Sequence, residues 1–158
     1  MEDVKNISKE EYEHVLDLVP IICVDLVIMN DNGEVLVVKR QNEPGKGEWW
    51  IPGGRLLKNE SIEECARRKA KEELGLDLEP IEVLGSGETI FNNSPFEGVN
   101  SHTVNFFVLM SELGNQEIKP DESQHTEWDF VSDIGEDADP YMIEIFDTLN
   151  EYFELSEE

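Results

Sequence analysis

Hydrophobic residues near the start of the chain recur at a helical spacing. Tyr12 and Leu16 lie four positions apart on one face, and Ser8 is followed three positions later by a glutamate, the arrangement of a capping box. The pattern predicts a short amphipathic helix over residues 8–18, which Pro20 prevents from continuing.

Two apolar stretches follow, and a turn sequence separates them. The first runs from Ile21 to Met29 and the second from Glu34 to Arg40, with Asn-Asp-Asn-Gly between them. Apolar, β-branched stretches on both sides of such a turn predict a β-hairpin. Because few polar positions interrupt either stretch, we expect both strands to be mostly buried.

Glycine and proline punctuate the middle of the chain and mark off the remaining elements. Trp49-Trp50-Ile51 remains as a short extended segment between turns. Ser61 begins a second capping-box sequence, for a helix that should end at Leu74 because Gly75 suits a left-handed cap. Further strands and a final helix are expected at residues 81–84, 88–91, 103–110, 127–131 and 141–153.

The size and charge of the chain limit the classes of protein to which it can belong. Its 158 residues, 39% of them hydrophobic, suit one domain, residues 1–158, in which residues 1–19 form an N-terminal helical extension. A net charge of -25 repels nucleic acid, because phosphate contacts need local cations. No apolar run approaches the roughly 20 residues that span a bilayer, and the first residues lack the order of a secretory signal. We therefore expect a cytoplasmic protein with no nucleic-acid or membrane partner.

The helix that begins at Ser61 carries two charged residues on its apolar face. Lys69 and Glu73 share that face with the apolar residues between 62 and 70, the side that should meet the sheet. Two unpaired charges directed toward a core would cost several kcal/mol each, so something must compensate them. One solution is an ion pair between Lys69 and Glu73, with Glu72 exposed to solvent. The other is a cation held by Glu72 and Glu73 from adjacent helix positions.

The spacing around this helix favours the cation. Over 23 residues the chain reads G-x5-E-x7-R-x-A-x-E-E-x-G-L, at Gly54, Glu60, Arg68, Ala70, Glu72, Glu73, Gly75 and Leu76. This pattern resembles the Nudix box, G-x5-E-x7-R-E-U-x-E-E-x-G-U, in which U is aliphatic. The resemblance implies the α/β fold of that family, an α/β/α sandwich with a mixed β-sheet between helices. It also implies a metal-dependent hydrolase that acts on a nucleoside diphosphate linked to another group.

The same resemblance assigns ligands to the metal. Glu72 and Glu73 would hold a divalent cation together with the backbone carbonyl of Gly53, which in the family commonly reaches the same ion. Such oxygen ligands suit Mg²⁺, or Mn²⁺ in its place, and not zinc. A cation there turns the repulsion between the carboxylates and a diphosphate into attraction. Arg68 would orient the glutamates or contact phosphate; the alternative is a surface arginine that pairs with Glu64 or Glu72.

One position departs from the box, because Lys69 stands where the family pattern has a glutamate. In ordinary members that glutamate helps to activate water or to hold an additional cation, and a protonated lysine does neither. The chain also resembles, over nearly its whole length, the GDP-mannose mannosyl hydrolases, a Nudix branch with an altered box. The matching stretches are Glu10-Glu11-Tyr12, residues 20–26 with Asp25, Val38-Lys39-Arg40, residues 49–55 and residues 120–125.

Resemblance to this branch implies a reaction and a set of residues that carry it. In the branch, water attacks the sugar carbon and releases GDP and mannose with inversion. Gly53, Glu73 and Gln124 match its metal ligands. His125 matches its general base, a role that suits an imidazole with a pKa near its ordinary value. The favoured substrate is therefore a nucleotide sugar, GDP-mannose or its close variant GDP-glucose.

Further side chains would contact the substrate. Arg40, Arg55 and Arg68 would neutralise the charge that develops on the leaving GDP. Asp25 matches an aspartate near the sugar in the branch; the alternative is a hydrogen-bonded structural carboxylate. Tyr12 matches an aromatic residue of the branch that packs on the base of the nucleotide. That contact could cross between two chains, so a homodimer is one possibility. The alternative for Tyr12 is a residue of the helix core.

Several departures from the branch leave other activities open. Ser123 adds a residue before the metal-binding glutamine, and Asn105 or Phe106 occupies the place of a catalytic tyrosine. The box also keeps Glu72, which the branch typically lacks. Cleavage of the phosphoanhydride of ADP-ribose or a related nucleotide is therefore one alternative. A non-catalytic nucleotide sensor, in which Lys69 neutralises the pocket, is another.

Overall fold

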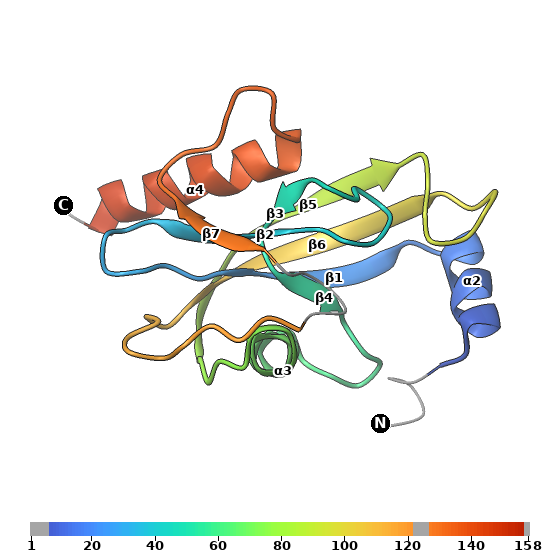
Figure 1. Ribbon diagram of the computed structural model, residues 1–158, viewed down its shortest axis with the longest axis horizontal. Coiled ribbons are helices and arrows are strands. Elements are labelled where there is room, and N and C mark those ends of the chain that lie inside the picture. The colour runs from blue at the N-terminus through green and yellow to red at the C-terminus, as the bar shows by residue number, and fades with distance from the viewer. Residues whose placement is uncertain (1–6, 122–126, 157–158) are drawn as a thin grey trace.

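The chain forms two β-sheets with helices on both sides (Figure 1). A computed structural model describes residues 7–121 and 127–156. Within these residues the helices are α2 (Lys9–Leu18), α3 (Ile62–Leu74) and α4 (Pro140–Ser156). The strands are β1 (Ile21–Val27), β2 (Val35–Lys39), β3 (Trp49–Trp50), β4 (Gly53–Arg55), β5 (Pro80–Phe91), β6 (Ser101–Met110) and β7 (Trp128–Val131). None of the described helices has the length and apolar character needed to cross a membrane.

The larger sheet is mixed and has the strand order β4-β1-β6-β5. Its strands β1 and β6 are parallel, whereas β1 with β4 and β5 with β6 are antiparallel. The smaller sheet, β3-β2-β7, is antiparallel. In Figure 1, α3 lies on one side of the strands and α4 on the opposite side. The expected α/β class, with a mixed sheet between helices, is confirmed.

Strand residues alternate between two cores, because successive side chains point to opposite faces of a sheet. Val24 and Leu26 of β1 are fully buried and pack in one cluster with Ala70 and other residues of α3. Val27 packs in the other cluster, with Ile145 and other residues of α4. Both faces are therefore covered over the last residues of β1, 24–27, which agrees with the few polar positions there.

The hairpin predicted between residues 21–29 and 34–40 is wrong for most of its length. The strands β1 and β2 belong to different sheets, and they meet near the turn through a bridge between Met29 and Val35. Along the rest of its length, β1 takes β4 and β6 as neighbours. A turn sequence specifies that the chain reverses, but the partners of a buried strand depend on packing with distant segments.

The two short strands predicted between residues 81 and 91 form one continuous strand, β5, with register shifts near its start. Its glycines make room for aromatic rings instead of ending the strand. A Cβ on Gly85 would lie 2.7 Å from the ring of Phe107. A Cβ on Gly87 would lie 2.5 Å from the ring of Tyr141. Close packing, and not a turn, therefore accounts for these two glycines.

The ends of α3 lie where the sequence predicts them. Ser61 Oγ accepts a hydrogen bond from Glu64 N at 3.0 Å, and Glu64 Oε2 accepts one from Ser61 N at 3.1 Å, which completes the capping box. At the other end Gly75 has a φ of 68°, the left-handed conformation of a helix cap. These two ends fix the direction in which the last turns of α3 present their charged side chains.

Candidate active site

The floor of a cavity of about 640 Å³ is formed by the larger sheet. The strands β1 and β6 run in parallel register with Cys23 beside Asn105, so Cys23, Asp25, Thr103 and Asn105 all face the same side. The next residue on that face of β6, Phe107, already packs against α4. The cavity therefore occupies the part of this face that α4 leaves uncovered, and its volume lies in the range of small-molecule sites, about 300–1,000 Å³.

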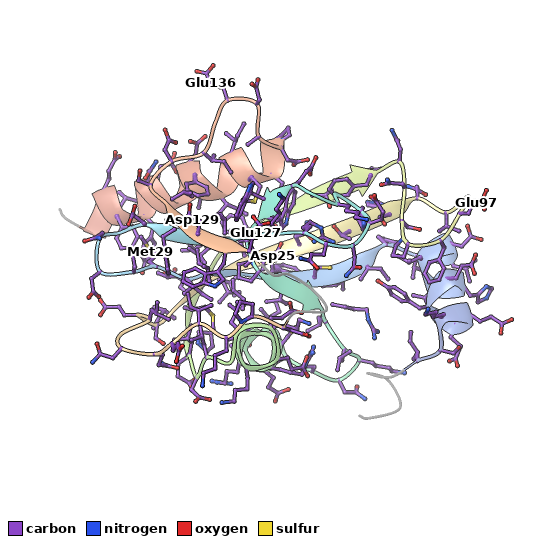
Figure 2. The ribbon with its side chains drawn as sticks, viewed as in Figure 1. Asp25, Met29, Glu97, Glu127, Asp129 and Glu136 are labelled. Atoms are coloured by element: carbon purple, nitrogen blue, oxygen red, sulfur yellow. The ribbon has the colours of Figure 1, made fainter. Side chains whose placement is uncertain are left out.

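Segments that are far apart in the sequence form the walls of this cavity. They are α2, the β2–β3 loop, the β5–β6 loop, β4 and α3. The predicted site residues that line the cavity together are Tyr12, Asp25, Arg40, Gly53, Arg55 and Glu73. In Figure 2, Asp25 lies near the middle of the molecule, between α3 and α4. Two other predicted residues, Arg68 and Glu72, are on α3 but do not line the cavity. The predicted Gln124 and His125 lie outside the described residues.

An ion pair joins Lys69 to Glu73, as one of the two interpretations of the helix requires. Lys69 Nζ lies 2.6 Å from Glu73 Oε1 and 3.8 Å from Glu72 Oε2. The side chains of Lys69 and Glu73 are 14% and 7% exposed, so the pair is largely shielded from solvent. A Cβ on Gly54 would overlap the Lys69 side chain and lie 2.8 Å from Nζ. The absence of a side chain at Gly54 therefore leaves the space through which the Lys69 side chain reaches Glu73.

Arg68 holds carboxylates on the neighbouring face of α3. Its Nε and one terminal nitrogen donate to the two oxygens of Glu60 at 2.6 and 2.9 Å. The other terminal nitrogen donates to Glu72 Oε2 at 3.1 Å, and a further bond of 3.0 Å reaches the carbonyl oxygen of Arg55. Such a fork of hydrogen bonds fixes the plane of the guanidinium. The bond to Glu72 fits both an arginine that orients the glutamates and the alternative of an arginine that pairs with Glu72, so the role of Arg68 stays a prediction.

Replacing Glu60 by glutamine is expected to lower the free energy of unfolding by about 2 kcal/mol, because the change removes the buried one of the two carboxylates that Arg68 bonds. The Glu60 side chain is 3% exposed. Burial alone would raise the pKa of Glu60, but its bonds to Arg68 hold the pKa below the ordinary value of 4.5. The stabilisation is therefore present above pH 4.5 and is lost as the pH falls through the lowered pKa.

Urea unfolding at about pH 7 and about pH 3 measures both parts of this prediction. The matched control is Glu63→Gln, on the exposed side of the same helix. Equal stability of the two variants at neutral pH would contradict the role assigned to Glu60.

Asp25 is buried and hydrogen-bonded, and it also lines the cavity, so its position agrees with both alternatives. It is 6% exposed, and its Oδ2 accepts a 2.7 Å hydrogen bond from the Tyr141 hydroxyl. Burial raises the pKa of Asp25 to about 7, while the bond from Tyr141 and the positive charge of Arg40 oppose the rise. The Tyr141 ring stacks on Trp50 with 5.9 Å between centroids, which fixes the hydroxyl. Asp25 is therefore a rigid carboxyl group whose charge changes near neutral pH.

Four cationic side chains, Arg40, Lys46, Arg55 and Lys69, line the cavity of a chain whose net charge is -25. Arg40 Nε donates to the carbonyl oxygen of Pro44 at 2.7 Å, which ties the arginine to the β2–β3 loop. The Arg55 guanidinium lies 5.7 Å from the centre of the Tyr12 ring, a distance typical of a cation–π contact. Cations gathered in one cavity of an acidic protein favour an anionic ligand.

A hard divalent cation fits the carboxylates of this site together with other oxygen ligands. Glu73 lines the cavity and, with Glu72, already faces a positive charge, the Lys69 ammonium. In the described part of the chain, no three histidine, cysteine or acidic side chains come together as a metal site. The remaining ligands would therefore be amide oxygens, backbone oxygens or water, which Mg²⁺ accepts. The carbonyl of Gly53, which lines the same cavity, and the amide of Gln124 stay predictions of this kind.

Four polar side chains of the cavity floor were not identified from the sequence as binding residues: Thr89, Ser101, Thr103 and Asn105. We call them the polar floor. Asn105 interrupts an otherwise apolar stretch of β6, and a polar residue at such a position is a signal that could have identified it. Lys46, on the β2–β3 loop, also lines the cavity, and no pattern in the sequence points to it.

Comparison with known sequences agrees with this geometry. The family model of the NUDIX domain matches residues 19–146. The chain is 34% identical over 144 residues to the low-salt glycan biosynthesis protein Agl8 of Haloferax volcanii, with 91% of each protein covered. It is 31% identical over 113 residues to the ADP-ribose pyrophosphatase of Methanocaldococcus jannaschii, with 72% of this chain and 63% of that protein covered.

Comparison with solved structures gives the same fold. The MutT protein of Methanosarcina mazei superimposes with a TM-score of 0.69 at 24% identity, covering 85% of this chain and 96% of that one. Nudix hydrolases generally use divalent metal ions such as Mg²⁺ and bind small nucleotide substrates. Because the family match extends over most of the sequence, from β1 into α4, this chain belongs to the Nudix hydrolase family.

Proposed function

We propose that the chain hydrolyses a nucleoside diphosphate sugar, with GDP-mannose as the first candidate and GDP-glucose as the second. The observation that carries the proposal is the position of Lys69. It replaces the box glutamate that would activate water for attack on phosphorus, and its ammonium lies 2.6 Å from Glu73. In the proposal the water-activating base lies elsewhere and, as in the resembled branch, the bond to be broken is the one between the sugar carbon and the diphosphate.

In the proposed reaction, water adds its oxygen to the anomeric carbon of the sugar while the bond from that carbon to the β-phosphate oxygen breaks. His125 accepts the proton of the water, and GDP leaves. Arg40 and Arg55, which line the cavity, stabilise the charge on the departing diphosphate. Bound Mg²⁺, held by Glu73 with Gly53 and Gln124, would neutralise the same oxygens.

The relative in Haloferax volcanii supports the class of substrate. Its name places that protein in glycan biosynthesis, and its sequence aligns with 91% of this chain. Glycans are assembled from activated sugars, most of which are nucleoside diphosphate sugars. A Nudix hydrolase that releases a sugar from its nucleotide suits that chemistry. The proposal also includes a cytoplasmic location.

Hydrolysis of GDP-mannose in water enriched in oxygen-18 tests the position of cleavage. We expect GDP and mannose as products, with the label in mannose, because water attacks carbon. The control is the same mixture without protein. Label in phosphate, with GMP and mannose 1-phosphate as products, would overturn attack at the sugar carbon. It would establish ordinary pyrophosphohydrolysis in its place.

Pyrophosphohydrolysis of ADP-ribose is the second candidate, since two observations favour it. Glu72 is retained in the box, and the relative in Methanocaldococcus jannaschii is an ADP-ribose pyrophosphatase. This activity would yield AMP and ribose 5-phosphate from ADP-ribose. A third candidate, a nucleotide sensor, follows from the neutralisation of Glu73 by Lys69. The absence of turnover with either nucleotide, together with tight binding of one of them, would favour the sensor.

A homodimer that involves α2 is a further part of the proposal. The apolar side chains of Leu18 and Val19, at the end of this helix, are 64% and 53% exposed. Exposed apolar residues of this kind are typical of a surface that another chain covers. Sedimentation equilibrium that gives the mass of a monomer would remove this part of the proposal and leave the rest intact.

A further inference from the structure

The polar floor, Thr89, Ser101, Thr103 and Asn105, has no part in the reaction proposed above. The four residues lie on the two antiparallel strands β5 and β6, where Thr89 is the register partner of Thr103. Thr89, Ser101 and Asn105 are 6%, 3% and 3% exposed, and all four line the cavity. A set of buried polar groups on the floor of a ligand cavity needs hydrogen-bond partners.

Asn105 has no such partner among residues 7–121 and 127–156. Its amide makes no hydrogen bond to the residues that the structure describes, although the side chain is almost completely buried. Its neighbours across the sheet are Cys23 on β1 and Gly87 on β5, and neither offers an oxygen or nitrogen from a side chain. The amide is not among the fully buried polar atoms that lack a partner, because Asn105 lines the cavity and can meet water there. A ligand in the cavity would take the place of that water.

The hydroxyl groups of the polar floor can also form hydrogen bonds with a ligand. Thr89 Oγ1 and Thr103 Oγ1 lie 2.5 Å apart and share one hydrogen bond, so one hydroxyl proton of the pair can be donated to a third group. The Ser101 hydroxyl makes no hydrogen bond within the described residues, and this residue is 3% exposed. Together the four side chains offer both donors and acceptors, and none of them carries a charge.

The distribution of charge in the cavity indicates which part of a ligand the polar floor binds. A diphosphate is attracted to the cations of the cavity, which are Arg40, Lys46, Arg55 and Lys69. Along β1 the residues facing the cavity run from Asp25 to Ile21, about 13 Å at the usual rise of a strand. That length holds a sugar ring next to a diphosphate. The uncharged floor therefore suits the uncharged part of the ligand.

We propose that the polar floor binds the hydroxyl groups of the substrate's sugar, and that Asn105 determines which sugar is accepted. A primary amide can donate to one hydroxyl group of a vicinal diol and accept from the next. A site built to bond a particular hydroxyl rejects a sugar that lacks it, because its buried polar groups are then left unpaired. The inference rests on the proposed function for the class of substrate alone, a nucleoside diphosphate sugar.

Equilibrium binding of GDP-mannose and of GDP tests this role without requiring turnover. The titrations are done by calorimetry on the full chain, with Ca²⁺ in place of Mg²⁺. We expect Asn105→Ala to weaken GDP-mannose binding about 10-fold and to change GDP binding less than about 2-fold, because GDP lacks the sugar that the amide bonds. The matched control is Asn150→Ala, an exposed asparagine on α4 that does not line this cavity. It should leave both affinities unchanged.

Two results would overturn the inference. The first is unchanged binding of GDP-mannose to Asn105→Ala, and the second is an equal loss for GDP-mannose and GDP, which would assign the amide to the nucleoside or the diphosphate. Should the alanine variant fail to fold, Asn105→Thr, which suits a strand, is measured in the same way. If GDP-mannose does not bind the unaltered protein, ADP-ribose and ADP replace the pair of ligands.

The stability of Asn105→Ala separates this role from a structural one. Removing an amide that has no hydrogen-bond partner in the described part of the chain should leave the free energy of unfolding unchanged or raise it. A purely structural asparagine would lower it. The test also separates the inference from the proposed function. A protein that binds GDP-mannose through Asn105 but does not cleave it keeps the inference and loses the proposed reaction.

Discussion

Glu73→Gln is expected to reduce the turnover of GDP-mannose about 1,000-fold, the loss typical of removing a group that stabilises developing charge. Glu73 is the carboxylate of the box that lines the cavity, and we propose it as the principal ligand of Mg²⁺. Glutamine keeps the shape of the side chain but not the charge that a hard cation requires. The measurement is kcat with saturating Mg²⁺.

Two further variants of α3 make this result specific. Glu63→Gln, on the exposed side of the helix, should leave kcat unchanged. Glu72→Gln separates the two cleavage reactions, because pyrophosphohydrolysis by a pair of glutamates would suffer as much from this change as from Glu73→Gln. Attack at the sugar carbon predicts a loss of about 10-fold for Glu72→Gln, since its carboxylate acts through Arg68. Near-normal kcat in Glu73→Gln would mean that the pair with Lys69 is structural.

The helix that carries the box could be predicted almost residue by residue, because its signals are local. The capping box at Ser61 and the left-handed Gly75 act within one turn of the helix ends. The ion pair between Lys69 and Glu73 is also local, since residues four apart on a helix are neighbours. The spacing of the sequence therefore predicts the pair, and the alternative of a bound cation stays a prediction.

Strand pairing was harder to predict, because it joins segments that are distant in the sequence. The partners of β1 are β4 and β6, and the second of these begins about 80 residues later. The turn that follows β1 gave the direction of the chain and a wrong partner. The resemblance to the branch predicted Asp25 and Glu73 in one site, and both line the cavity. The hydrogen bond from Tyr141 to Asp25 was not predictable, because it joins residues that are distant in the sequence.

Asn105 shows how the meaning of a residue depends on such pairing. In the sequence it was noted only as standing where the resembled branch has a catalytic tyrosine. Its place in the cavity follows from the parallel register with Cys23 and from a glycine, Gly87, on its other side. Neither neighbour can be read from the residues around Asn105. The chemistry of the polar floor is therefore a property of the sheet and not of any motif.

Asp25→Asn is expected to stabilise the protein above neutral pH and to leave its stability unchanged in acid. Burial raises the pKa of Asp25 from 3.8 to about 7 in the folded protein. Between these values the folded protein keeps a proton that the unfolded chain has released. The contribution of Asp25 to the free energy of unfolding therefore falls as the pH rises from about 4 to about 7, and then levels off. A shift of this size corresponds to about 4 kcal/mol.

Asparagine has the shape of the protonated carboxyl group and keeps an oxygen that accepts the bond from Tyr141, but it does not ionise. The variant should therefore gain up to about 4 kcal/mol over the unaltered protein near pH 8 and nothing near pH 4. Urea unfolding in EDTA, so that no metal contributes, measures the difference at each pH.

Asp31→Asn, in the exposed turn after β1, is the matched control, because removing any negative charge relieves repulsion in a chain of net charge -25. A gain in Asp25→Asn no larger than that of the control would mean that Asp25 ionises as an ordinary carboxylate, and that the floor of the cavity solvates charge as well as water does.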